Sequence, residues 1–394
     1  MNFDKLLDRM GTSCLKWDYV GTFYGDNDIV PMWVADSDFE APEEVKQAIK
    51  KRAEHGAYGY TVRPKRFYGA IINWVNKKYA WEIIKDNLIY TPGIVAAINW
   101  AVHAFTKEGD KIIVQSPVYY PFFSAVEGNK RILVDNNLVL KDGKYHMDFE
   151  DLKNKIDKDT KMIILCSPHN PVTRVWTRDE LRELGEICTK NNVLIISDEI
   201  HSDLILEGNV HTPIATISDE IAANTITLMA PSKTFNVAGL ETSVAIITNP
   251  ELKEKFVNFQ KSIGAGMSSI FGIEAFVACY EYGHEWLEEQ LKYIKSNVEY
   301  VKNFVKENMN TLNVIDPEGT YLLWVDCSSL KYNDDELKEF FIKKVKVALD
   351  MGTIFGKETG KDYVRFNLAT QRKIVEKVLK RFKEHYDIRM KELK

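Results

Sequence analysis

Between residues 88 and 248, short apolar runs alternate with amphipathic stretches. The runs begin at Leu88, Lys111, Lys161, Val193, Thr225 and Val244. Residues 94–105 and 177–191 have the pattern of intervening helices, and Thr177 with Glu180 has the spacing of a capping box. Short, almost wholly apolar strands separated by helices predict a parallel sheet covered on both faces. A set of buried helices is the alternative, because runs this short have no decisive periodicity, but their Gly, Pro and Asn boundaries favour strands.

Beyond Gly283 the pattern changes to that of one long helix. Apolar residues recur every three or four positions, at Leu287, Leu291, Ile294, Val298, Val301 and Val305. We expect this face to pack at the junction with a second domain, with a coiled-coil partner surface as the alternative. Residues 321–325 and 363–368 are predicted strands, and a closing helix is predicted from Arg372. This part is expected to form a smaller α/β domain together with the N-terminal arm.

Composition narrows the class of protein. The chain has 394 residues, of which 45% are hydrophobic and 28% charged, with a formal net charge of −5. This balance gives no reason to expect a nucleic-acid or anionic-membrane partner. The five cysteines are scattered and odd in number, which argues against disulfide or zinc frameworks and favours a reducing cytoplasm. We find neither a signal peptide nor a run of apolar residues long enough to span a bilayer.

Four of the apolar runs are followed by residues that carry useful chemistry. These residues are Tyr119 with Tyr120, Asn170, Asp198 and Lys233. Open α/β sheets place ligand sites at the carboxyl ends of their strands, so we expect the four positions to meet in one crevice. An aromatic ring, an amide, a carboxylate and a primary amine together suit one cofactor, pyridoxal phosphate.

Lys233 and Asp198 would carry the chemistry of such a site. A lysine leaving a buried strand can have its pKa lowered and form a Schiff base, although an isolated Ser-Lys pair usually marks a surface lysine. A carboxylate at Asp198 is costly to bury without a cation, and a protonated pyridine nitrogen would provide one. Capping of the next turn is the alternative for Asp198. His201 is expected to support Asp198, and we consider a metal site at Asp198, His201 and Asp203 only as a minor alternative.

The remaining candidates are weaker when each is taken alone. Gly93, Ile94 and Val95 lie between a predicted strand and helix, where free backbone amides could bind a phosphate. Tyr119 or Tyr120 could stack on a flat ring or simply pack in the core. Asn170 could bond a ring oxygen or form an Asn-Pro turn. Arg365 interrupts an apolar strand and could bind a substrate carboxylate, or equally an internal Asp or Glu.

Taken together, these residues resemble fold-type I pyridoxal-phosphate enzymes of the class I/II aminotransferase group. Within that group the chain is more similar to the cystathionine β-lyase-like C–S lyases. The resemblance covers nearly the whole chain, from Trp17 to Ala369. The segments that carry it are MWVADSDF from Met32, HGAYGYT from His55, SPVYYPFF from Ser116, PHNPV from Pro168, SDEIHSDL from Ser197, SKTFNVAGL from Ser232 and VRFNLA from Val364.

The resemblance implies a fold and a set of roles. The fold is a three-layer α/β large domain with a mostly parallel seven-stranded sheet over residues 46–284, and a smaller α/β domain from residues 1–45 and 285–394. Lys233 would hold pyridoxal 5'-phosphate and shuttle protons, while Asp198 would pair with the ring nitrogen. Tyr119 would stack on the cofactor ring, Asn170 would hydrogen-bond the phenolic oxygen of the cofactor, and His201 would also contact the cofactor. Phosphate binding is implied for Gly93, Ile94, Val95 and Ser232. Substrate contact is implied for Arg365, Tyr120 and Ala35.

The resemblance also implies a homodimer. Tyr60 matches a tyrosine that in this family reaches the phosphate across the dimer interface, so each active site would be built from two chains. Neither a nucleic-acid nor a membrane partner is implied.

Four positions depart from the usual pattern of the family. Ser167 replaces a common Asn, and Thr173 stands where Gly is usual, so the backbone path near Asn170 is in question because Thr resists positive φ. Ser37 replaces a more typical Met. Glu241 stands where many aminotransferases carry a phosphate-binding Arg, and we expect its carboxylate to point away from the anion.

The resulting hypothesis is β-elimination from an L-amino acid that bears sulfur at Cβ, such as L-cystathionine or an L-cysteine-type substrate, giving a thiol, pyruvate and ammonia. The alternative is an aminotransferase, because the named residues would serve both reactions. A regulatory protein-binding role on the same fold is a third, less favoured hypothesis.

Overall fold

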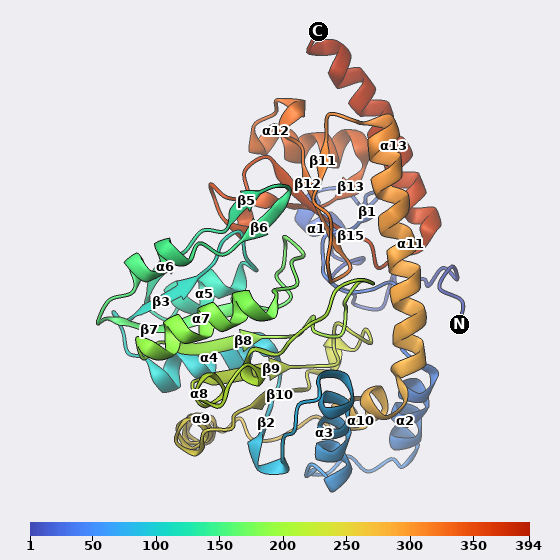
Figure 1. The fold of residues 1–394 in the computed structure, drawn as a ribbon. Helices are drawn as coiled ribbons and strands as arrows, with labels where there is room; N and C mark the ends of the chain where they lie inside the picture. The colour runs from blue at the N-terminus through green and yellow to red at the C-terminus, as the bar shows by residue number, and fades with distance from the viewer.

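A seven-stranded sheet with helices on both sides lies in the lower left part of the molecule in Figure 1. The computed structural model describes residues 1–394. The strand order of the seven-stranded sheet is β2-β10-β9-β8-β7-β3-β4. All neighbours pair in parallel except β10, which runs antiparallel to both β2 and β9. The strands are β2 (Leu88–Thr91), β3 (Lys111–Val114), β4 (Ile132–Asp135), β7 (Thr160–Cys166), β8 (Leu194–Asp198), β9 (Thr225–Met229) and β10 (Ser243–Ile246). The mostly parallel sheet predicted from the sequence is confirmed.

Strand β4 is the one member of this sheet that was not predicted from the sequence. It lies at the sheet edge and pairs only with β3. Its first residue, Ile132, is exposed, and the other three are only half-buried. It does contain a continuous apolar run, Ile132 to Val134, which is as long as the run in β3, so a signal for this strand was present in the sequence.

Alternate residues of each central strand point to opposite faces of the sheet. On one face, Ile112, Ile164 and Ile196 pack with α4 (Ile94–Phe105), α5 (Pro121–Glu127) and α9 (Pro250–Ser262). On the other, Ile113, Ile163 and Ile195 pack with α7 (Arg178–Lys190) and with the short helices α6 (Phe149–Lys155) and α8 (Asp219–Ala223). Both faces are therefore covered, which is why these strands contain few polar residues.

The helices predicted between the strands form where the sequence placed them. Helix α4 occupies residues 94–105. Helix α7 begins at a capping box, in which the Thr177 side chain accepts from the Glu180 amide and the Glu180 side chain accepts from the Thr177 amide. These bonds satisfy donors that the first turn of a helix leaves free.

A second, antiparallel sheet lies beyond the long helix. Its order is β11-β12-β15-β14, formed by β11 (Asn313–Val314), β12 (Leu322–Asp326), β15 (Tyr363–Asn367) and β14 (Asp350–Met351). It is accompanied by α12 (Asp334–Glu339) and α13 (Arg372–Glu392). The N-terminal arm, which includes α1 (Val20–Tyr24), joins this part through β1 (Val30–Pro31), which pairs in parallel with β13 (Val347–Ala348). The exact division at residues 45/46 and 284/285 stays a prediction.

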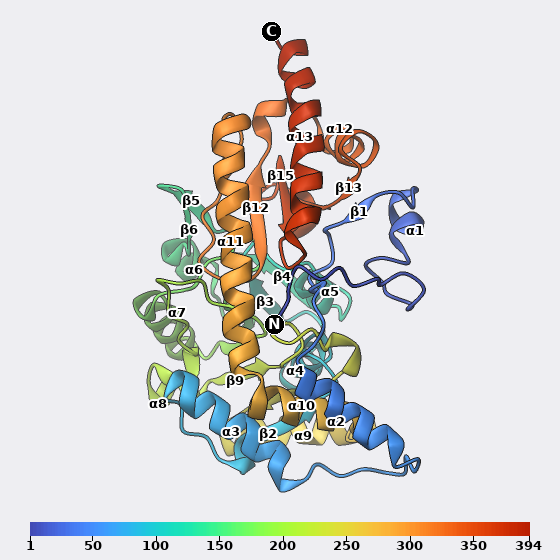
Figure 2. The ribbon, with the colours of Figure 1, turned by 90° about the vertical axis from the view of Figure 1, so that its right-hand side faces the viewer.

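The predicted long helix is α11 (His284–Asn308). It extends from the neighbourhood of α2 (Glu43–Glu54), α3 (Lys65–Tyr79) and α10 (Ile270–Tyr282) to α13 (Figures 1 and 2). Five of the six residues predicted for its apolar face are buried, and the sixth, Leu291, is half-buried against the same core. The helix therefore packs within the chain, and the coiled-coil alternative is not needed.

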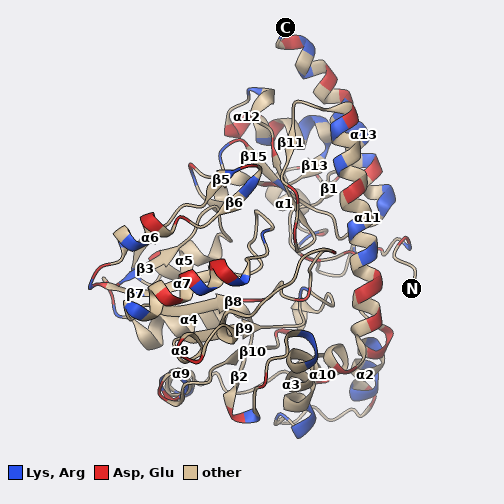
Figure 3. Cartoon of the chain, in the orientation of Figure 1, with Lys and Arg blue, Asp and Glu red and all other residues tan.

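Charged side chains of both signs are mixed along the outer helices, including α11 and α13 (Figure 3). None of the helices is both long enough and apolar enough to cross a membrane. A short hairpin, β5 (Val139–Lys141) with β6 (Lys144–His146), adds little to the core, since its first strand is wholly exposed.

Candidate active site

A cavity of about 320 Å³ opens at the carboxyl ends of β2, β7, β8 and β9. Tyr119, Asn170, Asp198 and Lys233 all line it, and Ala35 of the N-terminal arm closes one side. The four residues come from different segments and meet because parallel strands end at the same edge of the sheet. The convergence predicted from the strand ends is therefore confirmed.

The N-terminus of α4 forms one end of this cavity. Gly93, Ile94, Val95 and Ala96 line it, and no side chain caps the helix. A Cβ placed on Gly93 would meet no protein atom within 4 Å. The amides of the first turn thus remain available, next to the positive end of the helix dipole, and Ser232 lines the same cavity. This arrangement fits a phosphate group.

Asp198 presents a buried carboxylate without a paired cation. Its Oδ1 accepts a hydrogen bond of 3.1 Å from the Ile200 amide. Burial raises its pKa to about 7, although the Ile200 amide and the positive charge of Lys233 act in the opposite direction. A cation at this position would relieve the cost of burial, so the carboxylate fits a protonated ring nitrogen.

His201 also lines the cavity, but it does not support Asp198 in the expected way. No hydrogen bond joins the two side chains, and the buried His201 Nδ1 has no partner. Burial, followed by the charges of Lys233 and Arg365, lowers the pKa of His201 to about 3. The residue therefore faces the cavity as a neutral imidazole, and the expectation of a His201–Asp198 contact is corrected.

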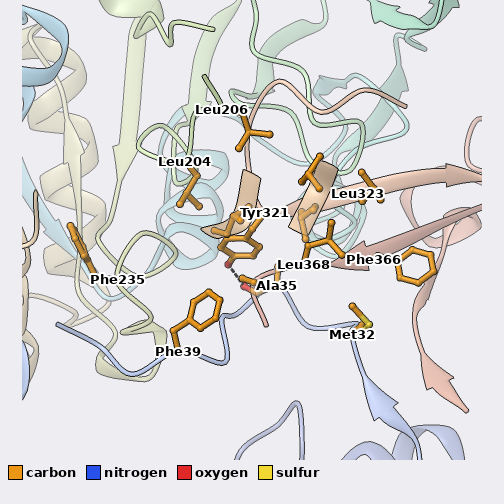
Figure 4. Packing of buried hydrophobic residues seen from close by; sticks show 14 of the residues in the cluster. Met32, Ala35, Phe39, Leu204, Leu206, Phe235, Tyr321, Leu323, Phe366 and Leu368 are labelled. Carbon is orange, nitrogen blue, oxygen red and sulfur yellow. Dashed lines mark hydrogen bonds between the residues drawn. The ribbon is translucent and has the colours of Figure 1, made fainter. Parts of the chain in front are cut away.

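Lys233 reaches across the cavity to the N-terminal arm. Its Nζ donates to the Ala35 carbonyl at 2.6 Å. The Tyr321 hydroxyl donates to the same carbonyl at 2.8 Å, as Figure 4 shows. Burial is the main cause that lowers the pKa of Lys233, while the nearby charge of Asp36 opposes the shift. A lowered pKa increases the neutral fraction of an amine, which is the form that acts as nucleophile and base.

Asn170 is held between the cavity and Arg365. Its Oδ1 accepts a 2.9 Å hydrogen bond from Arg365 Nη1, and its backbone amide donates to Cys166 Sγ at 3.4 Å. The Asn170 Nδ2 group makes no hydrogen bond within the protein, so it is free to donate to a ligand oxygen. Tyr119 lines the cavity with its ring 5.4 Å from that of Tyr120.

Arg365, Tyr120 and Tyr60 do not line this cavity. Arg365 is buried directly behind Asn170. Tyr120 is 43% exposed beside Tyr119, and Tyr60 is 100% exposed. The metal alternative at Asp198, His201 and Asp203 has no support, because no group of ligand side chains with metal-binding geometry is found.

Glu241 lines the cavity together with Thr242, and its backbone carbonyl accepts from the Tyr90 hydroxyl at 3.2 Å. Glu241 is exposed, and the expectation that its carboxylate points away from the anion stays a prediction. Ser37 is buried, and its hydroxyl has no hydrogen-bond partner. The Ser167 amide donates to the Asp198 carbonyl at 2.9 Å, which links the two strand ends.

Thr173 adopts the positive φ of 62° that a glycine would favour. It is fully buried, its amide donates to the His169 carbonyl at 2.7 Å, and its carbonyl accepts from the Glu318 and Gly319 amides. The Asn170 segment thus keeps its path with a β-branched residue in the left-handed region, where such residues are strained.

Thr173→Gly is expected to raise the free energy of unfolding by about 1 kcal/mol. Relief of roughly 1–3 kcal/mol of backbone strain outweighs the greater freedom of glycine in the unfolded chain and the loss of a small side chain. Thr173→Ala keeps the Cβ and should be less stable than wild type. Denaturant unfolding of wild type and the two variants measures the order of their stabilities. A Thr173→Gly variant less stable than wild type would show that Thr173 is not strained.

Several residues of the site escaped the sequence-based reasoning. Cys166 lines the cavity, Tyr321 holds Ala35, and Asp350 pairs with Arg365. Asn367 Nδ2 donates to the carbonyls of Val34 and Asp36, which fixes the segment that carries Ala35. Asn367 lies two residues after Arg365, and residues two apart in a strand lie on the same face of the sheet. This spacing is the signal from which Asn367 could have been predicted to lie beside the site.

Fold and cavity together define a class, and comparison with known proteins agrees. Residues 27–382 match the family model for aminotransferase class I and II, and the chain belongs to this family. Cystathionine beta-lyase PatB of Bacillus subtilis (strain 168) is 41% identical to this chain, and the match covers 97% of this chain and 99% of PatB.

Solved structures give the same result. The crystal structure of cystalysin from Treponema denticola, which contains a pyridoxal 5'-phosphate cofactor, matches with a TM-score of 0.95 and 37% identity over 100% of this chain and 99% of that one. The pyridoxal-phosphate-bound C–S lyase from Staphylococcus hominis matches with a TM-score of 0.91 and 33% identity over 98% of both chains.

Proposed function

We propose that this chain is a pyridoxal-phosphate-dependent C–S β-lyase that cleaves L-cystathionine or a related L-cysteine-type substrate to a thiol, pyruvate and ammonia. The observation that carries the proposal is the single cavity in which Lys233, Asp198, Tyr119 and Asn170 meet beside the uncapped N-terminus of α4. The choice of a lyase is supported by the identity to PatB and the likeness to two C–S lyase structures.

Each part of the cofactor has a matching group in the cavity. The first-turn amides of α4 and Ser232 would hold the phosphate, and Asp198 would pair with the ring nitrogen. Asn170 Nδ2 would donate to the phenolic oxygen, while the Tyr119 ring would stack on the pyridine. When bound, pyridoxal phosphate supplies an electron-accepting ring that stabilises negative charge at the substrate Cα.

Two side chains have separate roles in the elimination. Arg365 would hold the substrate carboxylate, and Lys233, as a neutral amine, would take the proton from Cα. The Cβ–S bond breaks, and the sulfur leaves as a thiol after it gains a proton. The remaining three-carbon fragment takes up water and yields pyruvate and ammonia, so that each turnover releases one of each product.

The test incubates cofactor-loaded protein with L-cystathionine and measures pyruvate, ammonia and free thiol. Release of all three in equal amounts supports the lyase. Exchange of the amino group with an added 2-oxo acid, with no thiol or pyruvate released from cystathionine or cysteine, would overturn it in favour of an aminotransferase.

We also propose a homodimer in which Tyr60 serves the site of the partner. Tyr60 is 100% exposed and lies in a segment that also exposes Tyr58 and Val62. Arg63 fixes this segment to the exposed loop near Met267 by hydrogen bonds to the Gly266 carbonyl and the Ser268 hydroxyl. A surface with this many exposed apolar side chains suits burial against a second copy.

Tyr60→Phe is expected to weaken cofactor affinity about tenfold, because a hydrogen bond to a charged phosphate oxygen is lost. Tyr282→Phe, at another exposed tyrosine, is the matched control. Titration of the apo form with pyridoxal phosphate measures the affinity for the cofactor. Analytical ultracentrifugation gives the mass of the protein in solution, which distinguishes a monomer from a dimer. A monomer at micromolar concentration, or an unchanged affinity in Tyr60→Phe, would contradict this proposal.

We place the protein in the cytoplasm as part of the same proposal. The support is that its five cysteines are odd in number and all free, four of them buried. Secreted proteins of this size more often pair their cysteines in disulfides.

A further inference from the structure

The buried guanidinium of Arg365 already has an internal carboxylate partner. Arg365 is 2% exposed, and its Nη2 donates to Asp350 Oδ2 in a short ion pair. The same Nη2 also donates to the Trp33 carbonyl at 2.8 Å, while Nη1 donates to Asn170 Oδ1. The Phe355 ring covers the guanidinium at 4.7 Å.

These bonds leave no complete edge of the guanidinium free. Two-point binding of a carboxylate uses either Nε with Nη2 or Nη1 with Nη2, so Nη2 is part of both edges. Both protons of Nη2 are taken, by Asp350 and by Trp33. Nε is buried without a partner, so its proton alone remains on that side. A substrate carboxylate can therefore bind bidentately only after Asp350 or the Trp33 carbonyl leaves Nη2, and Asp350 is the one of the two that is a side chain and carries the same charge as the substrate carboxylate.

Asp350 is well placed to be displaced rather than to act as a fixed anchor. It lies on β14, the short edge strand of the second sheet, directly opposite Arg365 on β15. Burial raises its pKa, which the charge and hydrogen bond of Arg365 oppose. Burial and then the negative charge of Asp350 raise the pKa of both Tyr24 and Tyr120.

We propose that Asp350 is a specificity-determining residue that occupies Arg365 in place of the substrate carboxylate and must be displaced when an L-amino acid binds. The consequence is selection for ligands that carry both an amine and a carboxylate. A carboxylate alone must compete with Asp350 without help, whereas an amino acid is also held through its amine in the Lys233 cavity. This inference rests on the proposed function, since it assumes that the cavity binds pyridoxal phosphate.

The test compares glycine with methylamine, two primary amines of which only glycine has a carboxylate. Binding of each to the cofactor-loaded protein is followed by the change in cofactor absorbance. In Asp350→Asn, which keeps a side-chain oxygen but loses the charge, the Kd for glycine is expected to fall about tenfold. The Kd for methylamine should change by less than about twofold. Asp362→Asn, at a half-buried carboxylate three residues before Arg365, is the matched control and should change neither.

Three outcomes would overturn a part of the argument, and they are distinguishable. If glycine binds more weakly or unchanged in Asp350→Asn while methylamine is unaffected, Asp350 only anchors Arg365. If the Kd values of glycine and methylamine change by the same factor, Asp350 acts on the cofactor instead. If neither ligand changes the absorbance of the wild-type protein, the proposed function itself is wrong. Asp350→Ser repeats the comparison with a smaller side chain should the Asn variant fold poorly.

Discussion

Lys233→Ala is expected to lower turnover of L-cystathionine by about 10⁴-fold or more. Lys233 is the only lysine or arginine that lines the cavity, and its Nζ is held by the Ala35 carbonyl at 2.6 Å. Under the proposed function, its removal takes away the amine that would bind the cofactor covalently and the base that would take the Cα proton. No other amine in the cavity can replace it.

The measurement is the rate of pyruvate release at saturating pyridoxal phosphate, so that weaker cofactor binding is separated from lost chemistry. Lys306→Ala is the control, because Lys306 is exposed on α11 and makes no hydrogen bond or ion pair. Its turnover should equal that of wild type. Turnover of Lys233→Ala within tenfold of wild type would refute the role assigned to this lysine.

Asp198→Asn is expected to reduce turnover by about 10²–10³-fold. The buried carboxylate would keep the ring nitrogen of the cofactor protonated, and a neutral amide cannot do so. Steady-state assay with the loaded variant measures the loss. Asp335→Asn, at an exposed aspartate in the first turn of α12, is the matched control.

The same variant should change how the stability of the apo protein depends on pH. Burial raises the pKa of Asp198 from 3.8 to about 7, so the folded state binds this proton more tightly than the unfolded state. The contribution of Asp198 to stability is therefore fully present below its ordinary pKa and is lost as the pH rises through about 7. Asp198→Asn should flatten the pH profile of unfolding in this window. An unchanged profile with unchanged turnover would show that Asp198 is not the buried acid inferred here.

The sequence alone determined the central sheet and the residues that end its strands. Apolar runs of four to seven residues between helix caps are sufficient for this, because strands covered on both faces have almost no polar positions. Since parallel strands end at one edge, the convergence of Tyr119, Asn170, Asp198 and Lys233 also followed from the chain. The edge strand β4 was missed, although Ile132, Leu133 and Val134 form an apolar run as long as that of β3.

Contacts between distant segments were decided only by the tertiary structure. Asp350 and Arg365 are neighbours because β14 pairs with β15, and the pairing of one internal carboxylate rather than another depends on strand register. The bond from Tyr321 to Ala35 and the missing bond between His201 and Asp198 likewise depend on packing. Residue types determined which chemistry the site can carry. The fold decided which side chains are free to perform it, because hydrogen bonds and burial are fixed only when the segments meet.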